Sequence, residues 1–154
     1  MFKKLGKVEK IKFKNWCVDK NNLMVKEKWF GKEVKEDRRM VWFGVGIELG
    51  KNEKFKGLEI DNGLRKRCLE FYGEDFNSLL LIKYGDGSKL NLHRDRDCFD
   101  KKVVIVNSGI CVFEYDGERK ILEDGGIYEI DGKKSHGVVK VVGERYSLSI
   151  RKVL

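Results

Sequence analysis

The sequence predicts a mainly β fold with one or two helices (α+β), namely a double-stranded β-helix, or jelly roll, of about eight core strands with an N-terminal β extension. Short apolar runs recur at nearly even spacing from residue 76 to the end, and turns rich in Asp and Gly separate them. Only one segment has the periodicity of a helix. At 154 residues the chain is long enough for one domain with a substantial core.

The N-terminal third is expected to supply short strands and turns at one end of the sheet. Val8 to Phe13 alternates apolar and polar residues, and Leu23 to Val25 follows an Asn-Asn turn. Met40 to Phe43 is an apolar run that ends at Gly44. These residues belong to an N-terminal extension that we place at 1–60.

A helix is predicted from Leu64 to Tyr72, within a support segment at 61–73. Asp61 precedes it as a typical N-cap, and Gly73 follows it as a typical C-terminal residue. Its apolar face is formed by Leu64, Cys68, Leu69 and Tyr72.

The jelly-roll core is predicted at 76–154. Its apolar runs are too short for helices, and Asp-Gly pairs such as those at Asp116 and Asp131 favour tight turns between them. Strands are expected at residues 78–84, 89–93, 103–107, 110–115, 120–122, 127–130, 137–142 and 146–153.

Composition restricts the classes of protein to which the chain can belong. No stretch approaches the roughly 18 apolar residues of a membrane span, and the N-terminus lacks the apolar run of a secretory signal. The four cysteines are isolated, which suggests neither a zinc knuckle nor a disulfide framework. We therefore expect a soluble, cytoplasmic or otherwise intracellular protein with reduced thiols, without membrane association and monomeric.

The positive charge of the chain is concentrated in its N-terminal quarter. Residues 1–40 hold thirteen Lys or Arg against six Asp or Glu, so they carry +7 of the net charge of +8. A basic surface attracts polyanions through phosphate neutralisation, which makes nucleic acid a reasonable partner. An ordinary solvated, lysine-rich surface explains the same charges equally well.

The chain has two histidines, and a carboxylate lies two residues after the first of them. His93 ends a predicted strand, and in extended backbone His93 and Asp95 point to the same side. His136 begins the next-to-last strand, which can face the first histidine in a jelly roll. Two imidazoles and one carboxylate leave three positions open, an arrangement that suits Fe(II) and dioxygen chemistry. By itself, however, His-x-Asp is also an ordinary surface pattern.

The last predicted strand has two different sides. One side is polar and carries two arginines. If this side is buried, its two guanidinium groups need an anion, and a dicarboxylate would satisfy both of them. A sheet with a solvated polar face is the alternative. The polar side consists of Arg145, Ser147, Ser149 and Arg151, and the apolar side of Tyr146, Leu148 and Ile150.

Five ordered motifs resemble the AlkB-like branch of the Fe(II)- and 2-oxoglutarate-dependent oxygenases. The strongest runs from Leu81 to Asp97 and contains a tyrosine, a glycine turn and His-x-Asp-x-Asp. The others are an apolar strand with Ser-x-Gly at 103–113, a glycine turn and strand at 125–128, the His-Gly-Val segment that begins at His136, and the Arg-x-Ser-x-Ser-x-Arg ending from Arg145 to Arg151.

The resemblance implies that the two histidines and Asp95 hold Fe(II), with 2-oxoglutarate as cosubstrate and O2 as oxidant. Carried over by motif, Arg145 pairs with the distal carboxylate of 2-oxoglutarate, and Ser147 and Tyr84 hydrogen-bond there. Arg151 serves the carboxylate beside the keto group.

The resemblance also implies contacts with the substrate. Asp97 matches the second aspartate of the family motif and is expected to accept a bond from an exocyclic amine; a loop carboxylate that balances Arg94 and Arg96 is the alternative. Arg38 and Trp42 lie in an Arg-x-x-x-Trp-Phe-Gly element similar to one found before the substrate lid of some relatives. Trp42 is therefore expected near a flipped base, unless it is a buried core tryptophan.

The chain departs from the family pattern in several places. Ile82 replaces an asparagine at the keto-acid end, Gly126 replaces an aspartate, and the stretch from Gly132 to His136 is shorter. The expected substrate lid, within 1–60, matches only from Arg38 to Gly44.

Together these features predict an Fe(II)- and 2-oxoglutarate-dependent dioxygenase that hydroxylates or demethylates alkylated bases in nucleic acid, as in DNA repair. An oxygenase that acts on a protein side chain or a small molecule is the first alternative, because fold does not determine substrate. A nucleic-acid-binding module that has lost turnover is the second, and the complete metal triad argues against it.

Overall fold

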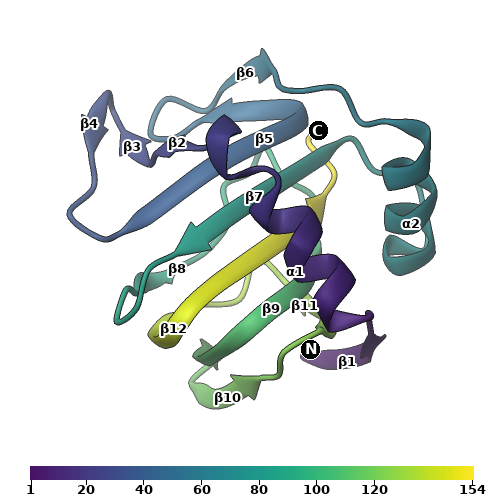
Figure 1. The fold of residues 1–154 in the computed structure, drawn as a ribbon. Coiled ribbons are helices and arrows are strands. Elements are labelled where there is room, and N and C mark those ends of the chain that lie inside the picture. Colours follow the sequence, from purple (N-terminus) through teal and green to yellow (C-terminus); the bar gives the residue numbers. More distant parts are fainter.

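The computed structural model describes residues 1–154 as antiparallel strands with two α-helices on one side (Figure 1). Neither helix has the length and hydropathy that a membrane crossing requires. The elements are β1 (Lys3–Lys7), α1 (Lys10–Val18), a 3-10 turn (Asn21–Leu23), β2 (Val25–Lys26), β3 (Lys28–Trp29), β4 (Lys32–Glu33), β5 (Arg38–Glu48), β6 (Glu53–Lys56), α2 (Asn62–Tyr72), β7 (Ser78–Tyr84), β8 (Leu90–His93), β9 (Lys102–Tyr115), β10 (Glu118–Leu122), β11 (Gly126–Asp131) and β12 (His136–Arg151).

Two long strands, β9 and β12, hold the fold together because each of them belongs to two sheets. In the major sheet, the C-terminal half of β12 pairs with β7 and with the N-terminal half of β9, and the strand order is β1-β11-β9-β12-β7-β5-β2. In the minor sheet, the other halves of β9 and β12 pair with β10 and β8, respectively. Buried side chains from both sheets form one core cluster, which confirms the predicted jelly roll.

Both long strands bend where the two sheets meet. The sequence predicts breaks near residues 108 and 144, but the chain continues through both places as β9 and β12. Gly109 has a φ of 92° and Gly143 a φ of 72°, in a backbone region that other residues rarely adopt. The register between the two strands also shifts between Val142 and Tyr146. Each predicted pair of short strands is therefore one bent strand.

The major sheet has one face toward the helices and an inner face toward the minor sheet. Alternate residues of its strands are buried on opposite faces, as the two-residue repeat of a strand requires. The helix-covered face contains Val41, Phe43, Leu79, Leu81, Val104, Val106, Leu148 and Ile150, and the inner face contains Met40, Trp42, Leu80, Ile82, Tyr84 and Ile105.

The prediction of a strand at residues 8–13 is wrong, because helix α1 occupies most of this segment. The Glu9 side chain accepts a hydrogen bond from the Lys12 backbone nitrogen at 2.6 Å and caps the helix. Cys17, one turn beyond the predicted strand, is completely buried against the sheet, whereas Ile11, which the strand would have buried, is 64% exposed. Packing on the sheet thus outweighs the local alternation of residue types.

Helix α2 forms as predicted, and both of its predicted ends are present. Asp61 accepts a hydrogen bond from the backbone nitrogen of Leu64 at 2.9 Å, and Gly73 ends the helix with a φ of 80°. Cys68 and Tyr72 are buried on the helix-covered face of the major sheet.

Part of the segment predicted as extension and lid is built into the major sheet. Strand β1 pairs with β11, and β5 pairs with β7 from Arg38 to Gly44. The short strands β2, β3, β4 and β6 lie beyond β5 at one end of the molecule (Figure 1). A lid role for these four strands stays a prediction.

Candidate metal centre and adjoining cavities

Strand pairing brings the two histidines of the chain together. His93 is the last residue of β8, His136 is the first of β12, and the two are paired across the minor sheet. Their ring centroids lie 4.4 Å apart. The Nε2 atoms of His93 and His136 lie 3.6 and 3.3 Å from Oδ1 of Asp95, and the three possible ligand atoms all lie within 4.8 Å of one another.

Hydrogen bonds determine which nitrogen of each imidazole faces this centre. Nδ1 of His93 lies 2.8 Å from the carbonyl oxygen of Asn91, and Nδ1 of His136 lies 2.8 Å from that of Lys134. A carbonyl oxygen only accepts, so each Nδ1 carries a proton, and in the neutral imidazole Nε2 has the lone pair that can bind a metal. Both rings are thereby oriented as metal ligands.

The loop that carries Asp95 depends on a glycine. The Asp95 backbone nitrogen donates to the Gly132 carbonyl oxygen at 2.8 Å. A Cβ atom at position 132 would lie 2.5 Å from Oδ2 of Asp95 and 3.0 Å from its Cγ, so a larger residue would displace the carboxylate. Gly132 is a site residue that the sequence reasoning treated only as part of a turn.

Neighbouring side chains keep Asp95 ionised although only 4% of its side chain is exposed. Burial by itself raises a carboxyl pKa, but Arg151, whose Nε donates to Oδ2 at 3.1 Å, and the adjacent imidazoles together outweigh it. The pKa of Asp95 therefore lies well below its usual value. Burial, together with the nearby His136, lowers the pKa of His93. Asp95 and His93 are thus in the protonation states that metal binding requires near pH 7.

The donor set fits a divalent transition metal. Two imidazole nitrogens and one carboxylate oxygen on one side of an ion leave positions open on the other, as suits Fe(II). Ligand atoms that bind at about 2.1 Å on one side of an ion lie about 3 Å apart. The three donors here lie within 4.8 Å of one another, so side-chain movements must draw them together to bring all three onto one ion.

A narrow inner cavity of about 50 Å³ leads from the metal centre into the space between the sheets. The predicted polar side of β12 lines it, and Arg145, Ser147 and Ser149 are all buried there. The row is therefore not the solvated face that the alternative interpretation required. The remaining lining residues are Leu80, Ile82, Tyr84, Leu90, Ile105, Phe113, Ile130 and Val138.

Arg145 lies at the inner cavity with 1% of its surface exposed. Its Nε donates to Oδ1 of Asn107 at 2.6 Å, and its guanidinium carbon lies 4.8 Å from the centre of the Tyr84 ring. Its terminal nitrogen Nη1 is buried without a hydrogen-bond partner. A buried cationic donor without a partner is costly, so this nitrogen indicates a place for an anion.

The other residues predicted around the cosubstrate line the same cavity. Burial raises the pKa of Tyr84, so its hydroxyl group stays protonated and can donate a hydrogen bond. Arg151 donates to Asp95, and its guanidinium carbon lies 5.2 Å from the centre of the Phe99 ring, so it lies beside the metal centre and lines the inner cavity. Ser147 lies between the two arginines on β12.

A larger outer cavity, of about 550 Å³, opens on the other side of the metal centre. His93, Asp95 and Arg151 line it, so a metal ion held here would face both cavities. Its walls include three aromatic side chains, and two exposed arginines belong to its lining. These residues are Trp29, Trp42, Phe99, Arg94 and Arg96.

A buried ion pair holds one wall of the outer cavity. Glu27 accepts hydrogen bonds from Nε and Nη2 of Arg38, at 3.0 and 2.6 Å, and from Nε1 of Trp29 at 3.0 Å. The remaining nitrogen of Arg38 donates to the carbonyl oxygen of Lys89. All three guanidinium nitrogens of Arg38 therefore already donate hydrogen bonds within the wall. A direct contact between Arg38 and a substrate would require the ion pair with Glu27 to separate.

Comparison with known proteins identifies the fold. No family model and no curated protein matches the sequence. The solved structure of OsALKBH1 matches with a TM-score of 0.70 at 12% identity, covering 94% of this chain and 91% of that one. A prolyl-4-hydroxylase from Pseudomonas putida matches with a TM-score of 0.63 at 17% identity, covering 99% of this chain and 92% of that one. This chain has an AlkB-like fold.

Within the AlkB-like fold, two of the three residues predicted to contact the substrate line the outer cavity, and the third lies on an exposed loop. Trp42 is 7% exposed and belongs to the core cluster, as the alternative interpretation expected, and it also lines the outer cavity; its place near a base stays a prediction. Arg38 lines the same cavity. Asp97 is exposed on the loop after Asp95 and is not part of the cavity lining.

Sequence reasoning missed several residues that position the site. Asn107 was the one polar residue inside a predicted apolar strand, which was a usable signal. Its amide nitrogen donates to the carbonyl oxygens of Gly109 and Glu123, both at 2.8 Å, so its oxygen is turned toward Arg145. Glu27 gave no signal, since it lies between two lysines in a segment that is typical of a solvated surface.

The basic residues of the N-terminal quarter lie on both sides of the AlkB-like fold. Lys10, Lys12 and Lys14 belong to α1, which covers the face of the major sheet opposite the metal centre (Figure 1). Lys26 and Lys28 belong to β2 and β3, beyond β5. Of these two groups, only Lys26 and Lys28 lie on the side of the cavities, so the charge excess of residues 1–40 does not form one surface beside the site.

Proposed function

We propose that this protein is an Fe(II)- and 2-oxoglutarate-dependent dioxygenase that oxidises alkylated bases in nucleic acid. One observation carries the proposal, namely that a single cavity joins two chemically complementary ends. His93 and His136, whose donor atoms lie within 4.8 Å of that of Asp95, line the cavity, and Arg145 with its unpartnered Nη1 lines the same cavity. A dicarboxylate with a keto group beside one carboxylate matches both features.

The residues then have the following roles. The two histidines and Asp95 hold the iron. Arg145 binds the distal carboxylate of 2-oxoglutarate through Nη1, and the hydroxyl groups of Tyr84 and Ser147 hydrogen-bond to the same carboxylate. Arg151 stabilises the carboxylate beside the keto group. Ile82, in place of the family asparagine, contributes only apolar contact.

When bound, iron and 2-oxoglutarate supply an oxidation in which dioxygen converts 2-oxoglutarate to succinate and carbon dioxide and hydroxylates a C–H bond of the substrate. The protein contributes position and environment. The apolar walls of the inner cavity exclude water, and the hydrogen bonds at Nδ1 hold both imidazoles in place. If the carbon belongs to an N-methyl group, the hydroxylated product releases formaldehyde.

The outer cavity supports an aromatic base as the substrate. Its volume of about 550 Å³ lies within the usual range for ligand pockets. Trp29, Trp42 and Phe99 provide aromatic surfaces of the kind that hold a base flipped out of its stack. Arg94 and Arg96 are exposed and suited to phosphate groups.

Hydroxylation of a protein side chain is the second candidate function. The likeness to a prolyl-4-hydroxylase, with a TM-score of 0.63, favours it specifically. The same aromatic walls also suit an apolar side chain or a proline ring.

Product analysis separates these functions. Purified protein is incubated with Fe(II), 2-oxoglutarate and either methylated single-stranded oligonucleotides or proline-containing peptides, and succinate and product masses are measured. We expect succinate, formaldehyde and loss of a methyl group from the oligonucleotide, all dependent on Fe(II). Gain of one oxygen by the peptide, with unchanged oligonucleotides, would establish the second candidate. Absence of succinate under every condition would overturn the dioxygenase proposal.

A further inference from the structure

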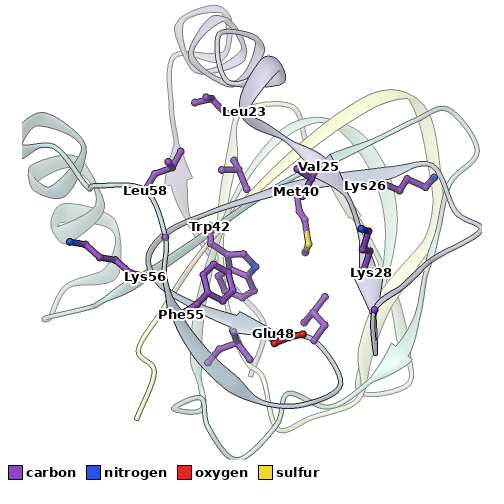
Figure 2. Close-up of a pocket in the computed structure, with 15 residues that line it drawn as sticks. Leu23, Val25, Lys26, Lys28, Met40, Trp42, Glu48, Phe55, Lys56 and Leu58 are labelled. Carbon is purple, nitrogen blue, oxygen red and sulfur yellow. The ribbon is translucent and has the colours of Figure 1, made fainter.

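A second pocket, of about 480 Å³, lies beside the outer cavity and is not lined by the metal centre (Figure 2). Met40, Trp42 and Leu49 line both spaces, so one wall separates them. The remaining walls come from the 3-10 turn, β2, β3 and the turn after it, β5, β6 and the segment that follows β6. We call this space the side pocket; none of the roles proposed above uses it.

Exposed apolar side chains gather around the side pocket. Leu23, Val25, Phe55 and Leu58 line it, and 45, 63, 44 and 40% of their surfaces are exposed, respectively. Single exposed apolar residues need no explanation, but a contiguous group of them indicates a binding surface.

The side pocket also has an aromatic surface held in a fixed position. The Phe55 ring lies against the backbone of Gly46, where a Cβ atom would come within 2.3 Å of the ring. It meets the Trp42 ring edge to face, with centroids 6.3 Å apart and planes at 86°. Phe55 therefore offers an ordered, partly exposed ring next to the wall that the two spaces share.

The rim of the side pocket is cationic. Lys26, Lys28 and Lys56 line it, and Figure 2 shows the ammonium ends of Lys26 and Lys56 at its periphery. Glu48 is the one acidic residue in the lining, and its carboxylate lies 3.6 Å from Nζ of Lys51. The combination of apolar floor, exposed ring and lysine rim suits a ligand with a flat apolar part and an attached anion.

We propose that the side pocket binds the nucleotide adjacent to the one that reacts, with its base against Phe55 and its phosphate near Lys28 and Lys56. Proteins bind single strands by stacking bases on aromatic side chains while lysines follow the backbone. Two successive nucleotides then lie on either side of Trp42. An apolar peptide segment would use the floor and leave the lysine rim without a partner. The inference rests on the proposed function, because it needs a reacting base in the outer cavity.

Oligonucleotide affinity tests the pocket directly. The dissociation constant is measured by fluorescence anisotropy, with Mn(II) in place of Fe(II) to prevent turnover, for a single-stranded pentanucleotide with a central N-methylated adenine. The corresponding mononucleotide is measured in parallel by competition. Phe55→Ala should weaken pentanucleotide binding at least about fivefold, because the base no longer stacks on the ring, and leave mononucleotide binding unchanged. Ile121→Ala, an exposed apolar residue of β10, is the matched control and should change neither value.

Salt dependence tests the lysine rim. The logarithm of the dissociation constant is plotted against the logarithm of the salt concentration. In the double variant Lys28→Ala and Lys56→Ala, the slope of this plot should fall by about 0.7 for each phosphate that is no longer neutralised. The matched control is Lys12→Ala with Lys14→Ala, which removes the same charge from α1 on the opposite side of the major sheet.

The outcomes distinguish this inference from the proposed function. Unchanged pentanucleotide affinity in Phe55→Ala, or equal weakening of mononucleotide binding, would overturn the side pocket as a nucleotide site even if the wild type forms succinate. If Phe55→Ala weakens binding of an apolar peptide while oligonucleotide binding is unchanged, the partner is a protein and the inference is also overturned. If the wild type forms no succinate but Phe55 supports oligonucleotide affinity, the proposed reaction fails and the nucleotide site stands.

Discussion

The two faces of the major sheet are built from the same strands but differ in what their burial requires. The apolar side of β12 packs under the two helices, whereas its polar side lines the inner cavity. Burial of the apolar side stabilises the fold by about 25 cal/mol for each Å² removed from water. Burial of Arg145 with an unpartnered nitrogen has the opposite effect. Stability alone therefore does not explain why charged side chains are buried on the inner face. A bound anion would give Arg145 a partner, and a bound cation would give the metal-centre side chains one.

The strongest test of this contrast is the removal of a metal ligand. His136→Ala should abolish Fe(II)-dependent succinate formation, because two ligands from one loop do not hold the ion in place. Succinate is measured by mass spectrometry, and far-ultraviolet circular dichroism shows whether the fold is retained. A folded variant that still produces succinate at the wild-type rate would remove His136 from the site.

Truncation on the helix-covered face should have the opposite profile. Leu148 is 3% exposed, so Leu148→Ala should lower the free energy of unfolding by about 2–5 kcal/mol. Urea denaturation measures this decrease. The KM for 2-oxoglutarate should stay at the wild-type value, since Leu148 belongs to the cluster on the other side of the sheet. A large rise in that KM would show that the two faces are not independent.

Truncation of the buried arginine should affect binding more than stability. Arg145→Met removes a charge-assisted bond worth about 1.5–3 kcal/mol, so the KM for 2-oxoglutarate should rise about tenfold or more. The unfolding free energy without cosubstrate should change little, because the unpartnered charge disappears with the bond to Asn107. In differential scanning fluorimetry, 2-oxoglutarate with Mn(II) should raise the Tm of the wild type and not that of the variant. Equal rises in Tm would contradict the assignment.

The alkylation rates of the cysteines should differ less than the quantities above, and they compare burial on the two faces of the major sheet. Burial raises the pKa of Cys68, on the buried side of α2, to about 12, and burial also raises the pKa of Cys111, between the sheets, against the effect of Arg145. Near pH 8 both thiols are protonated and unreactive, because the thiolate is the nucleophile. Iodoacetamide should therefore modify the partly exposed Cys98 first in the native protein, and all cysteines in urea. Alkylation of Cys68 as fast as Cys98 would show that α2 opens readily.

The C-terminal part of the fold was predictable because its local and tertiary preferences agree. Strand β7 has the predicted bounds, and the ends of α2 follow from Asp61 and Gly73. The convergence of His93 and His136 followed from their positions at strand ends, which the pairing of β8 with β12 brings together. The bends at Gly109 and Gly143 were not predictable in detail, since a glycine in a strand pattern is equally consistent with a break.

The N-terminal part was less predictable because its local pattern conflicts with its packing. The alternation at residues 8–13 favoured a strand, but burial of Cys17 against the sheet decides in favour of α1. The pair between Glu27 and Arg38 joins residues eleven positions apart across a turn, and neither residue shows this partner in its own sequence context. Asp97, predicted to contact the substrate, is exposed and absent from the cavity lining, although its neighbours Asp95 and Arg96 belong to that lining.

The most direct test of the central claim is a crystal structure grown with Mn(II) and 2-oxoglutarate, with anomalous scattering recorded at the manganese edge. We expect one anomalous peak at about 2.2 Å from Nε2 of His93, Nε2 of His136 and a carboxylate oxygen of Asp95. The far carboxylate of 2-oxoglutarate should lie within hydrogen-bonding distance of Nη1 of Arg145. An anomalous peak in contact with only one of the histidines, or 2-oxoglutarate bound away from Arg145, would contradict it.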